Sequence, residues 1–366
     1  MKRAFWQFWG IFLLVLLTSY LFTALEQQNS PQVKQTKHDI TQVKLTSPKI
    51  DKIKTTELAQ YVGMSSRHVQ EKFGQPTLTY QTAENMQWWL YNFDSQDYLR
   101  VGIDNYTNQI SSLFIVGERQ DIAPFSMGMS FKQLLKLSTF YANFEITANE
   151  QKFQLELSES DMNTHPLIAF ANNSYAICYL EPKTKKLYAL EYLNATELLR
   201  KGFYTVLSKT PLPVEFGGQL TWDDLSKAVP EDFWQTLNVK TALAKKQSLI
   251  KDEQLTDLAM KTMTTLKQTP KAFLNKKQQK AFQNMQNDEF SQVTKIDISD
   301  DSDFNKKMLT DFKEDVALNI YVLGPIFSAQ DLFTDSTFYA STKEFLNAKR
   351  LGIAYDKGLL VVVTGQ

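Results

Sequence analysis

Length, composition and charge already exclude several classes of protein. The chain has 366 residues, and its 40 Lys and Arg balance its 40 Asp and Glu, so no global field attracts nucleic acid. Its single cysteine, Cys178, excludes an intramolecular disulfide, a thiolate metal cluster and a lipid-modified cysteine near the N-terminus. Only three histidines are present, His38, His68 and His165, which limits metal and acid–base chemistry.

The chain begins with a long apolar stretch. Lys2 and Arg3 precede the uncharged segment 4–25, which as a helix extends about 33 Å and crosses a hydrocarbon core. The next charge is Glu26, so the positive-inside rule keeps the N-terminus in the cytoplasm and places the rest outside. A cleaved signal peptide is the alternative, but its apolar run is shorter, and Phe22 is too large to precede the best cleavage site. We therefore predict a single-pass anchor over residues 1–25.

A polar segment follows the anchor. Residues 26–54 are rich in Gln, Lys, Thr and Ser and contain no aromatic residue. Such a composition buries too little apolar surface to offset the entropy of ordering, so we predict a flexible extracytoplasmic linker. His38 lies in this linker, and we expect it to be inert.

The middle region contains an internal repeat. The triplet Gly63-Met64-Ser65 recurs 65 residues later as Gly128-Met129-Ser130, and each serine is suited to cap a short helix. Each helix leads to a β-hairpin, and the two hairpins align at an offset of 77 residues, from Ile103 to Leu180. We predict two copies of a helix-plus-antiparallel-strand unit, paired face to face, with a 12-residue insertion (77 minus 65) in one copy.

Three features of this region are candidate sites. The aromatic residues Trp88, Trp89, Tyr91 and Phe93 alternate as in a strand, which favours core packing over a ligand-stacking platform. His165 precedes a predicted strand without a Ser-His-Asp set around it, so a structural role is favoured. Cys178 lies within a predicted strand, where a small buried apolar role is expected.

Several short motifs of the middle region are similar to those of a known family. They are Gly63-Met64-Ser65, Phe73-Gly74-Gln75-Pro76, Trp88-Trp89-Leu90-Tyr91, Val101-Gly102-Ile103 and His165-Pro166-Leu167. On these motifs, residues 55–205 resemble the CAP-associated domain, which in Gram-positive bacteria precedes a CAP (SCP/PR-1-like) domain. The resemblance implies an extracytoplasmic location and no known catalysis for this part.

Residues 212–366 mix helices with antiparallel strands. Apolar residues recur at helical spacing from Leu255 to Leu266, and the end of the chain, 351–365, alternates around an Asp356-Lys357-Gly358 turn. The region therefore favours an α+β domain. It resembles a degenerate CAP domain, since the segments 257–263, 317–320 and 333–353 follow the order of that family's motifs. The resemblance implies an α-β-α sandwich.

The departures from the CAP pattern fall on the family's metal-binding cleft. Leu318 stands where the family has a Glu, followed by Asn319, and Tyr339 stands where it has a His. No His occurs after residue 165, so the imidazole ligands of a transition metal are missing. We expect these degenerate positions to carry no catalytic residue, metal or cofactor.

Two further segments have charged patterns. Residues 301–305 begin like a calcium loop, but Lys306 and Phe312 replace the glycine and the acid that the loop requires, which favours a solvated turn. The stretch 240–280 is rich in Lys, which suits anionic wall polymers or lipid head groups but more commonly marks the exposed faces of helices.

The whole chain therefore predicts an α+β protein with a transmembrane anchor, a duplicated middle domain and a CAP-like domain. Its favoured function is a membrane-tethered binding or scaffolding protein of the cell envelope, without catalysis, whose partner is a wall polymer, a peptide or an envelope protein. The alternative is an envelope hydrolase that uses two carboxylates in one cleft. Glu314, Asp315, Asp331 and Asp335 are its nearest candidates.

Overall fold

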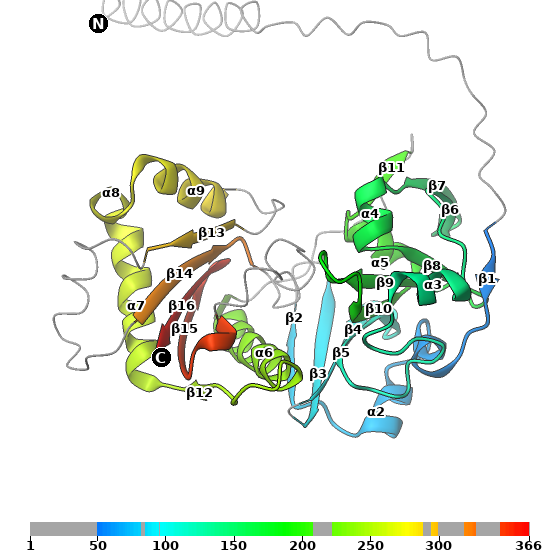
Figure 1. The fold of residues 1–366 in the computed structure, drawn as a ribbon, viewed down its shortest axis with the longest axis horizontal. Coiled ribbons are helices and arrows are strands. Elements are labelled where there is room, and N and C mark those ends of the chain that lie inside the picture. The colour runs from blue at the N-terminus through cyan, green and yellow to red at the C-terminus, as the bar shows by residue number, and fades with distance from the viewer. Residues whose placement is uncertain are drawn as a thin grey trace, which may run out of the picture. The chain divides into compact units, whose positions relative to one another are not determined.

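The computed structural model describes residues 50–81, 85–94, 96–207, 222–287, 294–298, 318–326 and 345–365 (Figure 1). Residues Ser47–Gln366 group into one compact unit by their contacts. The predicted anchor, residues 1–25, and the linker up to residue 49 lie outside the described residues. Among the helices that are described, none has both the length and the apolar character needed to cross a bilayer.

The middle region is built on an eight-stranded sheet. The strand order is β1-β8-β9-β10-β5-β4-β3-β2, and all neighbours are antiparallel except β1 and β8. In chain order the strands are β1 (Lys52–Ile53), β2 (Leu78–Gln81), β3 (Met86–Asp94), β4 (Asp97–Asp104), β5 (Ile110–Gly117), β8 (Leu167–Phe170), β9 (Tyr175–Leu180) and β10 (Leu187–Leu193).

The predicted repeat is present in the backbone hydrogen bonds. In the first copy Gly63 donates to the carbonyl of Ile110, and in the second Gly128 donates to that of Leu187. The serine that follows each triplet forms an isolated bridge, Ser65 with Gln109 and Ser130 with Lys186. The helices that follow are α2 (Arg67–Phe73) and α3 (Phe131–Leu137), and Ser130 caps α3 through a complete capping box, as predicted. The matching prediction for Ser65 was wrong, because the N-cap of α2 is Ser66, which makes no side-chain capping hydrogen bond.

The two copies lie side by side and not face to face, so that part of the prediction was wrong. β5 of the first copy pairs antiparallel with β10 of the second, and Phe114 lies opposite Glu191 at the centre. These two residues are themselves related by the offset of 77, so a local two-fold axis passes between them. Edge pairing buries the backbone polar groups of both strands, which stacked sheets would leave unpaired.

Both faces of the eight-stranded sheet are buried. One face packs beneath α2, α3 and the 3-10 helix η1 (Glu57–Tyr61). The other packs against a three-stranded sheet and two short helices, whose members are β6 (Asn143–Ala148), β7 (Gln151–Glu156), β11 (Thr205–Leu207), α4 (Glu159–Thr164) and α5 (Ala195–Arg200). β6, β7 and α4 lie between α3 and β8, where the longer second copy has its extra residues.

The aromatic strand and the single cysteine belong to this core. Trp88 is buried on one face of β3, and Trp89 and Tyr91 pack on the other, while the side chain of Phe93 lies outside the described set. Cys178 is fully buried in β9, and burial raises the pKa of its thiol. The structural interpretation of both features is confirmed.

The C-terminal region places helices on both faces of a five-stranded sheet (Figure 1). The strand order is β12-β15-β16-β14-β13, with β12 (Ile250–Lys251), β13 (Thr294–Asp297), β14 (Leu318–Gly324), β15 (Arg350–Asp356) and β16 (Leu359–Gly365). One face packs against α6 (Trp222–Leu243) and η2 (Phe345–Asn347). The other packs against α7 (Glu253–Gln268), α8 (Pro270–Phe273) and α9 (Lys276–Asn287). The predicted C-terminal hairpin is β15–β16.

Candidate functional site

Helix α6 contacts both large sheets. It packs against β15 on the C-terminal sheet and against β2, β4 and β5 of the eight-stranded sheet. Asp232, Thr236 and Lys240 follow one another at intervals of four residues, so these polar side chains share one face of the helix. All three are buried, although charged side chains such as Asp and Lys are rarely found fully buried.

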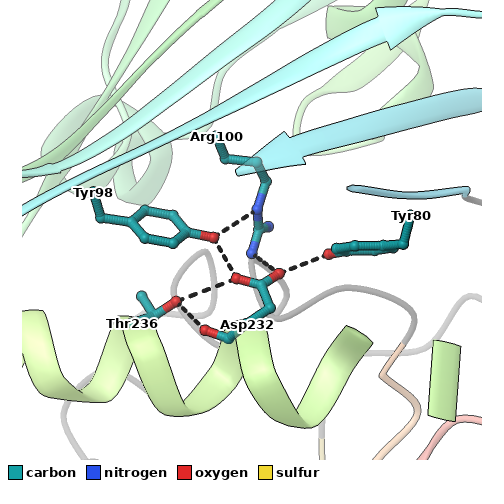
Figure 2. Close-up of polar contacts among 5 residues, drawn as sticks. All are labelled: Tyr80, Tyr98, Arg100, Asp232 and Thr236. Carbon is teal, nitrogen blue, oxygen red and sulfur yellow. Dashed lines mark hydrogen bonds and ion pairs between the residues drawn. The ribbon is translucent and has the colours of Figure 1, made fainter. Parts of the chain in front are cut away.

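The first of these residues anchors α6 to the sheet. Arg100 on β4 and Asp232 have no exposed side-chain surface, and the guanidinium Nη2 lies 2.5 Å from the Asp232 carboxylate. Figure 2 shows that Tyr80 and Tyr98 point at the same carboxylate from the sheet side, and that both hydroxyls donate to it. Thr236 donates to the Asp232 carbonyl at 2.6 Å, within the helix. The buried charge of Asp232 is therefore surrounded by donors.

The electrostatics of this cluster follow from its burial. Burial raises the pKa of Tyr80 and Tyr98 well above the ordinary value, and the neighbouring Asp232 carboxylate raises it further, so both remain hydroxyl donors. Burial alone would lower the pKa of Arg100, but the charge of Asp232 raises it well above the ordinary value. The cluster is a fully paired ion pair that fixes the position of α6.

The C-terminal end of α6 forms one wall of a pocket. The pocket has a volume of about 650 Å³, within the range of small-ligand sites. The other walls come from the segment after β5 and from the β9–β10 hairpin, with one residue of η2. Its apolar lining includes Val116, Leu187, Leu243 and Leu346.

Charges of both signs line the same pocket. Glu118 and Arg119 follow β5, Glu181 and Lys186 belong to the hairpin, and Lys240 comes from α6. The Arg119 guanidinium donates to both carboxylate oxygens of Asp121, at 2.9 and 2.8 Å. Glu181 accepts a hydrogen bond from the amide of Thr184.

Lys240 is the most buried of these charged residues. Its side chain is buried, with 6% of the residue exposed, and burial lowers its pKa to about 7. At neutral pH the amine therefore exists in charged and neutral forms together. An ammonium at this position gains more from an opposite charge than one in water does.

Comparison with known proteins identifies the middle region. Residues 62–204 match the family model described as CAP-associated N-terminal. The chain carries a CAP-associated N-terminal domain. A curated relative, the membrane protein YlbC of Bacillus subtilis (strain 168), is 26% identical over 185 residues. The match covers 50% of this chain and 49% of that protein, so it spans about half the length of each.

Two solved structures share the fold. An extracellular protein containing a SCP domain from Bacillus anthracis str. Ames has a TM-score of 0.62 and 15% identity, over 87% of this chain and 98% of that one. A cysteine-rich secretory protein from Staphylococcus aureus subsp. aureus Mu50 has a TM-score of 0.62 and 16% identity, over 86% and 97%. The likeness extends well beyond the CAP-associated domain and confirms a mixed α+β, SCP-like fold.

The predicted cleft positions do not assemble into one site in the described residues. Leu318 and Asn319 begin β14, and strand alternation turns Leu318 toward the α7–α9 face and Asn319 toward the opposite face. Tyr339 lies outside the described residues, as do Glu314, Asp315, Asp331, Asp335 and the calcium-like segment 301–305. Within the described ranges, His, Cys, Asp and Glu do not gather in groups of three or more.

His165 packs as a structural residue beneath the CAP-associated sheet. Its ring stacks on Phe203, its Nδ1 lies 3.0 Å from the hydroxyl of Thr164, and its carbonyl accepts from Tyr204. The structure supports the interpretation made from the sequence.

The pocket itself was missed by sequence reasoning, which assigned Lys240 to an exposed lysine-rich stretch. Most described lysines of that stretch are exposed, but Lys240 is buried. The available signal was the four-residue spacing of Asp232, Thr236 and Lys240, which marks a polar stripe on a helix whose neighbouring face is apolar.

Proposed function

We propose that this protein is a membrane-tethered binding protein of the Gram-positive cell envelope, which acts by holding a ligand and not by catalysis. The observation that carries the proposal is the pocket of about 650 Å³ between the CAP-associated domain and the end of α6. It combines an apolar lining with charges of both signs, the usual composition of a specific small-ligand site.

The proposed location is supported by the relatives and by the N-terminal segment. The curated relative is a membrane protein, and one structural neighbour is an extracellular protein. The apolar run 4–25, preceded by Lys2 and Arg3, is long enough for one span with the folded part outside.

Binding is also supported by the fixed position of α6, the helix that forms one wall of the pocket. The Arg100–Asp232 cluster fixes α6 against the eight-stranded sheet, and Lys240 lies two helical turns farther along the same helix. Preformed walls lower the entropic cost of binding, because few side chains have to be ordered when the ligand enters.

The test is to fill the pocket without changing its charge. Ala244 lines the pocket and is exposed, so Ala244→Trp adds bulk there with little expected effect on stability. Full-length protein in detergent micelles is incubated with the low-molecular-weight fraction of a digested Gram-positive envelope, and retained species are identified by mass spectrometry. We expect wild type to retain species that Ala244→Trp does not.

The matched control is Lys227→Trp, which adds the same bulk to an exposed residue of α6 outside the pocket. It should retain the same species as wild type. Equal retention by wild type and Ala244→Trp would contradict a binding role for the pocket.

A further inference from the structure

The three helices on the outer face of the C-terminal sheet carry charge of one sign. Although the whole chain is neutral, residues 258–287 of α7, α8 and α9 contain six lysines and no Asp or Glu. Five of them are exposed, and the sixth, Lys267, is ion-paired with Asp356. The exposed five are Lys261, Lys271, Lys276, Lys277 and Lys280. The solvent side of these helices is therefore strongly basic.

Four of the exposed lysines form a basic cluster on two neighbouring helices. Lys276, Lys277 and Lys280 lie in the first two turns of α9, and Lys271 lies in α8, which contacts α9. Their ammonium groups have no ion-pair partner among the residues that the structure describes. The neighbouring strand β13 adds one lysine and one aspartate, whose charges cancel. The cluster therefore keeps its full positive charge at the surface.

This arrangement is unfavourable for α9 itself. Lys280 lies four residues after Lys276 and three after Lys277, and like charges at these spacings repel on a helix surface. Cations in the first turn also oppose the helix dipole, and that turn contains no acidic residue to offset them. Helix stability alone would favour Asp or Glu here. Local rules that are broken without a compensating contact are typical of functional surfaces.

The cluster lies on the far side of the folded part from the predicted linker. The linker leads into β1, at one edge of the eight-stranded sheet, whereas α6 packs on β2, β4 and β5 in the other half. Helices α7–α9 cover the face of the C-terminal sheet that points away from α6. Lysine clusters that bind lipid head groups lie next to the membrane span. The position of this cluster instead favours a partner in the cell wall.

We propose that the basic cluster of Lys271, Lys276, Lys277 and Lys280 binds an anionic, phosphate-bearing polymer of the cell wall. Each ammonium group is a compact charge on a flexible stem, so it can follow phosphates that are repeated along a flexible chain. Several weak contacts to one polymer add together, as in other complexes with polyanions. The cluster shares no residue with the pocket lining, so this surface is additional to the proposed ligand site.

The experiment measures binding of the full-length protein, in non-ionic detergent micelles, to immobilised poly(glycerol phosphate) purified from a Gram-positive wall. Immobilised dextran is the uncharged polymer control. Wild type should bind the phosphate polymer and not dextran, and binding should weaken as NaCl is raised. The triple variant Lys276→Gln, Lys277→Gln and Lys280→Gln should bind at least about ten-fold more weakly, because three of the four charges are lost.

A second triple variant controls for net charge. Lys132→Gln, Lys136→Gln and Lys183→Gln remove the same charge from exposed lysines of the CAP-associated domain. This protein should bind the phosphate polymer as wild type does. An equal loss of binding in both triple variants would mean that net charge alone is responsible, and the assignment to the basic cluster would be overturned.

Stability separates a binding role of the cluster from a structural one. Because the lysines of α9 repel one another, the triple variant at 276, 277 and 280 should unfold at the same urea concentration as wild type or at a higher one. If it loses stability together with polymer binding, the lysines support the fold and the proposal is overturned.

Two other occupants of the cluster are outcomes of the same measurements. If captured phosphatidylglycerol vesicles retain wild type through the three lysines of α9 and the polymer does not, the anion is a lipid head group. If the polymer binds only after Asp300, Asp301 and Asp303 are changed to Asn, this acidic stretch of the same chain occupies the lysines. Either result overturns the proposal. Ala244→Trp should leave polymer binding unchanged, so this proposal and the proposed pocket function fail independently.

Discussion

The Arg100–Asp232 ion pair is completely buried. Two sites far apart in sequence, on β4 and α6, meet with no exposed side-chain surface. Removing these charges from water is costly, so the ion pair fixes the position of α6 on the sheet but adds little net stability. Tyr80 and Tyr98 extend the same network from the sheet and make the position of Asp232 more specific.

A substitution that breaks only one partner should therefore be severe. Asp232→Asn leaves the buried guanidinium without an opposite charge, and we expect the free energy of unfolding to fall by about 3–5 kcal/mol. The double variant Arg100→Met with Asp232→Leu removes both charges and should recover much of that loss. Urea denaturation of the three proteins measures both values. A double variant less stable than Asp232→Asn would show that the pair itself stabilises the fold.

Burial of Lys240 predicts that the free energy of unfolding rises with pH above neutrality. A lysine in an ordinary ion pair would make it fall as the pH rises. The pKa of Lys240 is about 7 in the folded protein and about 10 in the unfolded chain. Between these pH values the unfolded chain binds more protons, so the free energy of unfolding rises with pH, by at most about 1.4 kcal/mol per pH unit.

The comparison variant for this effect is Lys240→Met, which has no titrating group there. Relative to it, wild type should be least stable at about pH 6, with the deficit shrinking toward about pH 10. Denaturant titrations across this range measure the difference. A constant difference between the two proteins would mean that the amine is solvated in the folded state.

Residue types account for which single sites were predictable. Cys178 and His165 were interpreted correctly, because a small apolar side chain in a strand and a lone histidine have a common structural explanation. The burial of Lys240 was missed and Arg100 was not singled out, because charged side chains are rarely fully buried and the partner of Arg100 comes from a segment distant in sequence.

At the scale of elements, each copy of the repeat has a glycine with a positive φ at the same position, before its helix. Gly63 and Gly128 have φ of +86° and +83°, and a Cβ at either position would meet nothing within 4 Å. The cost of Ala at these sites is therefore conformational. We expect Gly63→Ala and Gly128→Ala each to lower the free energy of unfolding by about 1–2 kcal/mol.

The controls for this pair come from the same chain. Ser160→Ala changes an exposed helix residue and should have an effect within about 0.5 kcal/mol. Gly352→Ala should cost more than either repeat glycine, because its Cβ would lie 2.0 Å from the carbonyl carbon of Leu255 where β15 crosses α7. Equal effects at Gly63 and Gly352 in thermal unfolding would show that the two glycines share one cause.

Turn and cap signals made the elements predictable, but not their pairing. The α2 helix ends at Phe73 before Gly74 and Pro76, which are helix-stop residues, and the last hairpin turns at Asp356-Lys357-Gly358 as predicted. The near-absence of alternation between apolar and charged residues along β5 and β10 fits strands that are buried on both faces. It does not show whether two such strands meet by their faces or by their edges, which is why the side-by-side arrangement was missed.

At the scale of the whole molecule, the proposed orientation across the membrane has a direct test. The variant Gln35→Cys places a thiol in the predicted linker, and we expect a membrane-impermeant maleimide to label it in intact cells. The native Cys178 serves as the internal control, because it is buried and its pKa is raised. Labelling of Gln35→Cys only after cell lysis would contradict an extracytoplasmic linker.

The fold class was accessible from the sequence, while the pocket was not. Periodicity and the motif resemblance predicted an α+β chain with a CAP-associated domain, and the comparisons confirm both statements. The pocket is assembled from the end of β5, the β9–β10 hairpin and the end of α6, of which the first and the last lie more than a hundred residues apart. Local periodicity does not relate these segments, because they meet through long-range packing of α6 on β2, β4 and β5, which includes the buried contact of Arg100 with Asp232.

The pair Phe114 and Glu191 lies on the local two-fold axis, and its two residues differ in chemical type. In a symmetric dimer of single copies, this position would face its own twin, so a glutamate would oppose a glutamate in a buried strand. Glu191 instead has Ser112, Tyr179 and Lys201 as partners, and none of these is matched by the same residue type in the other copy. A carboxylate at this position therefore requires two halves of different sequence, and the covalently joined copies of this chain meet that requirement.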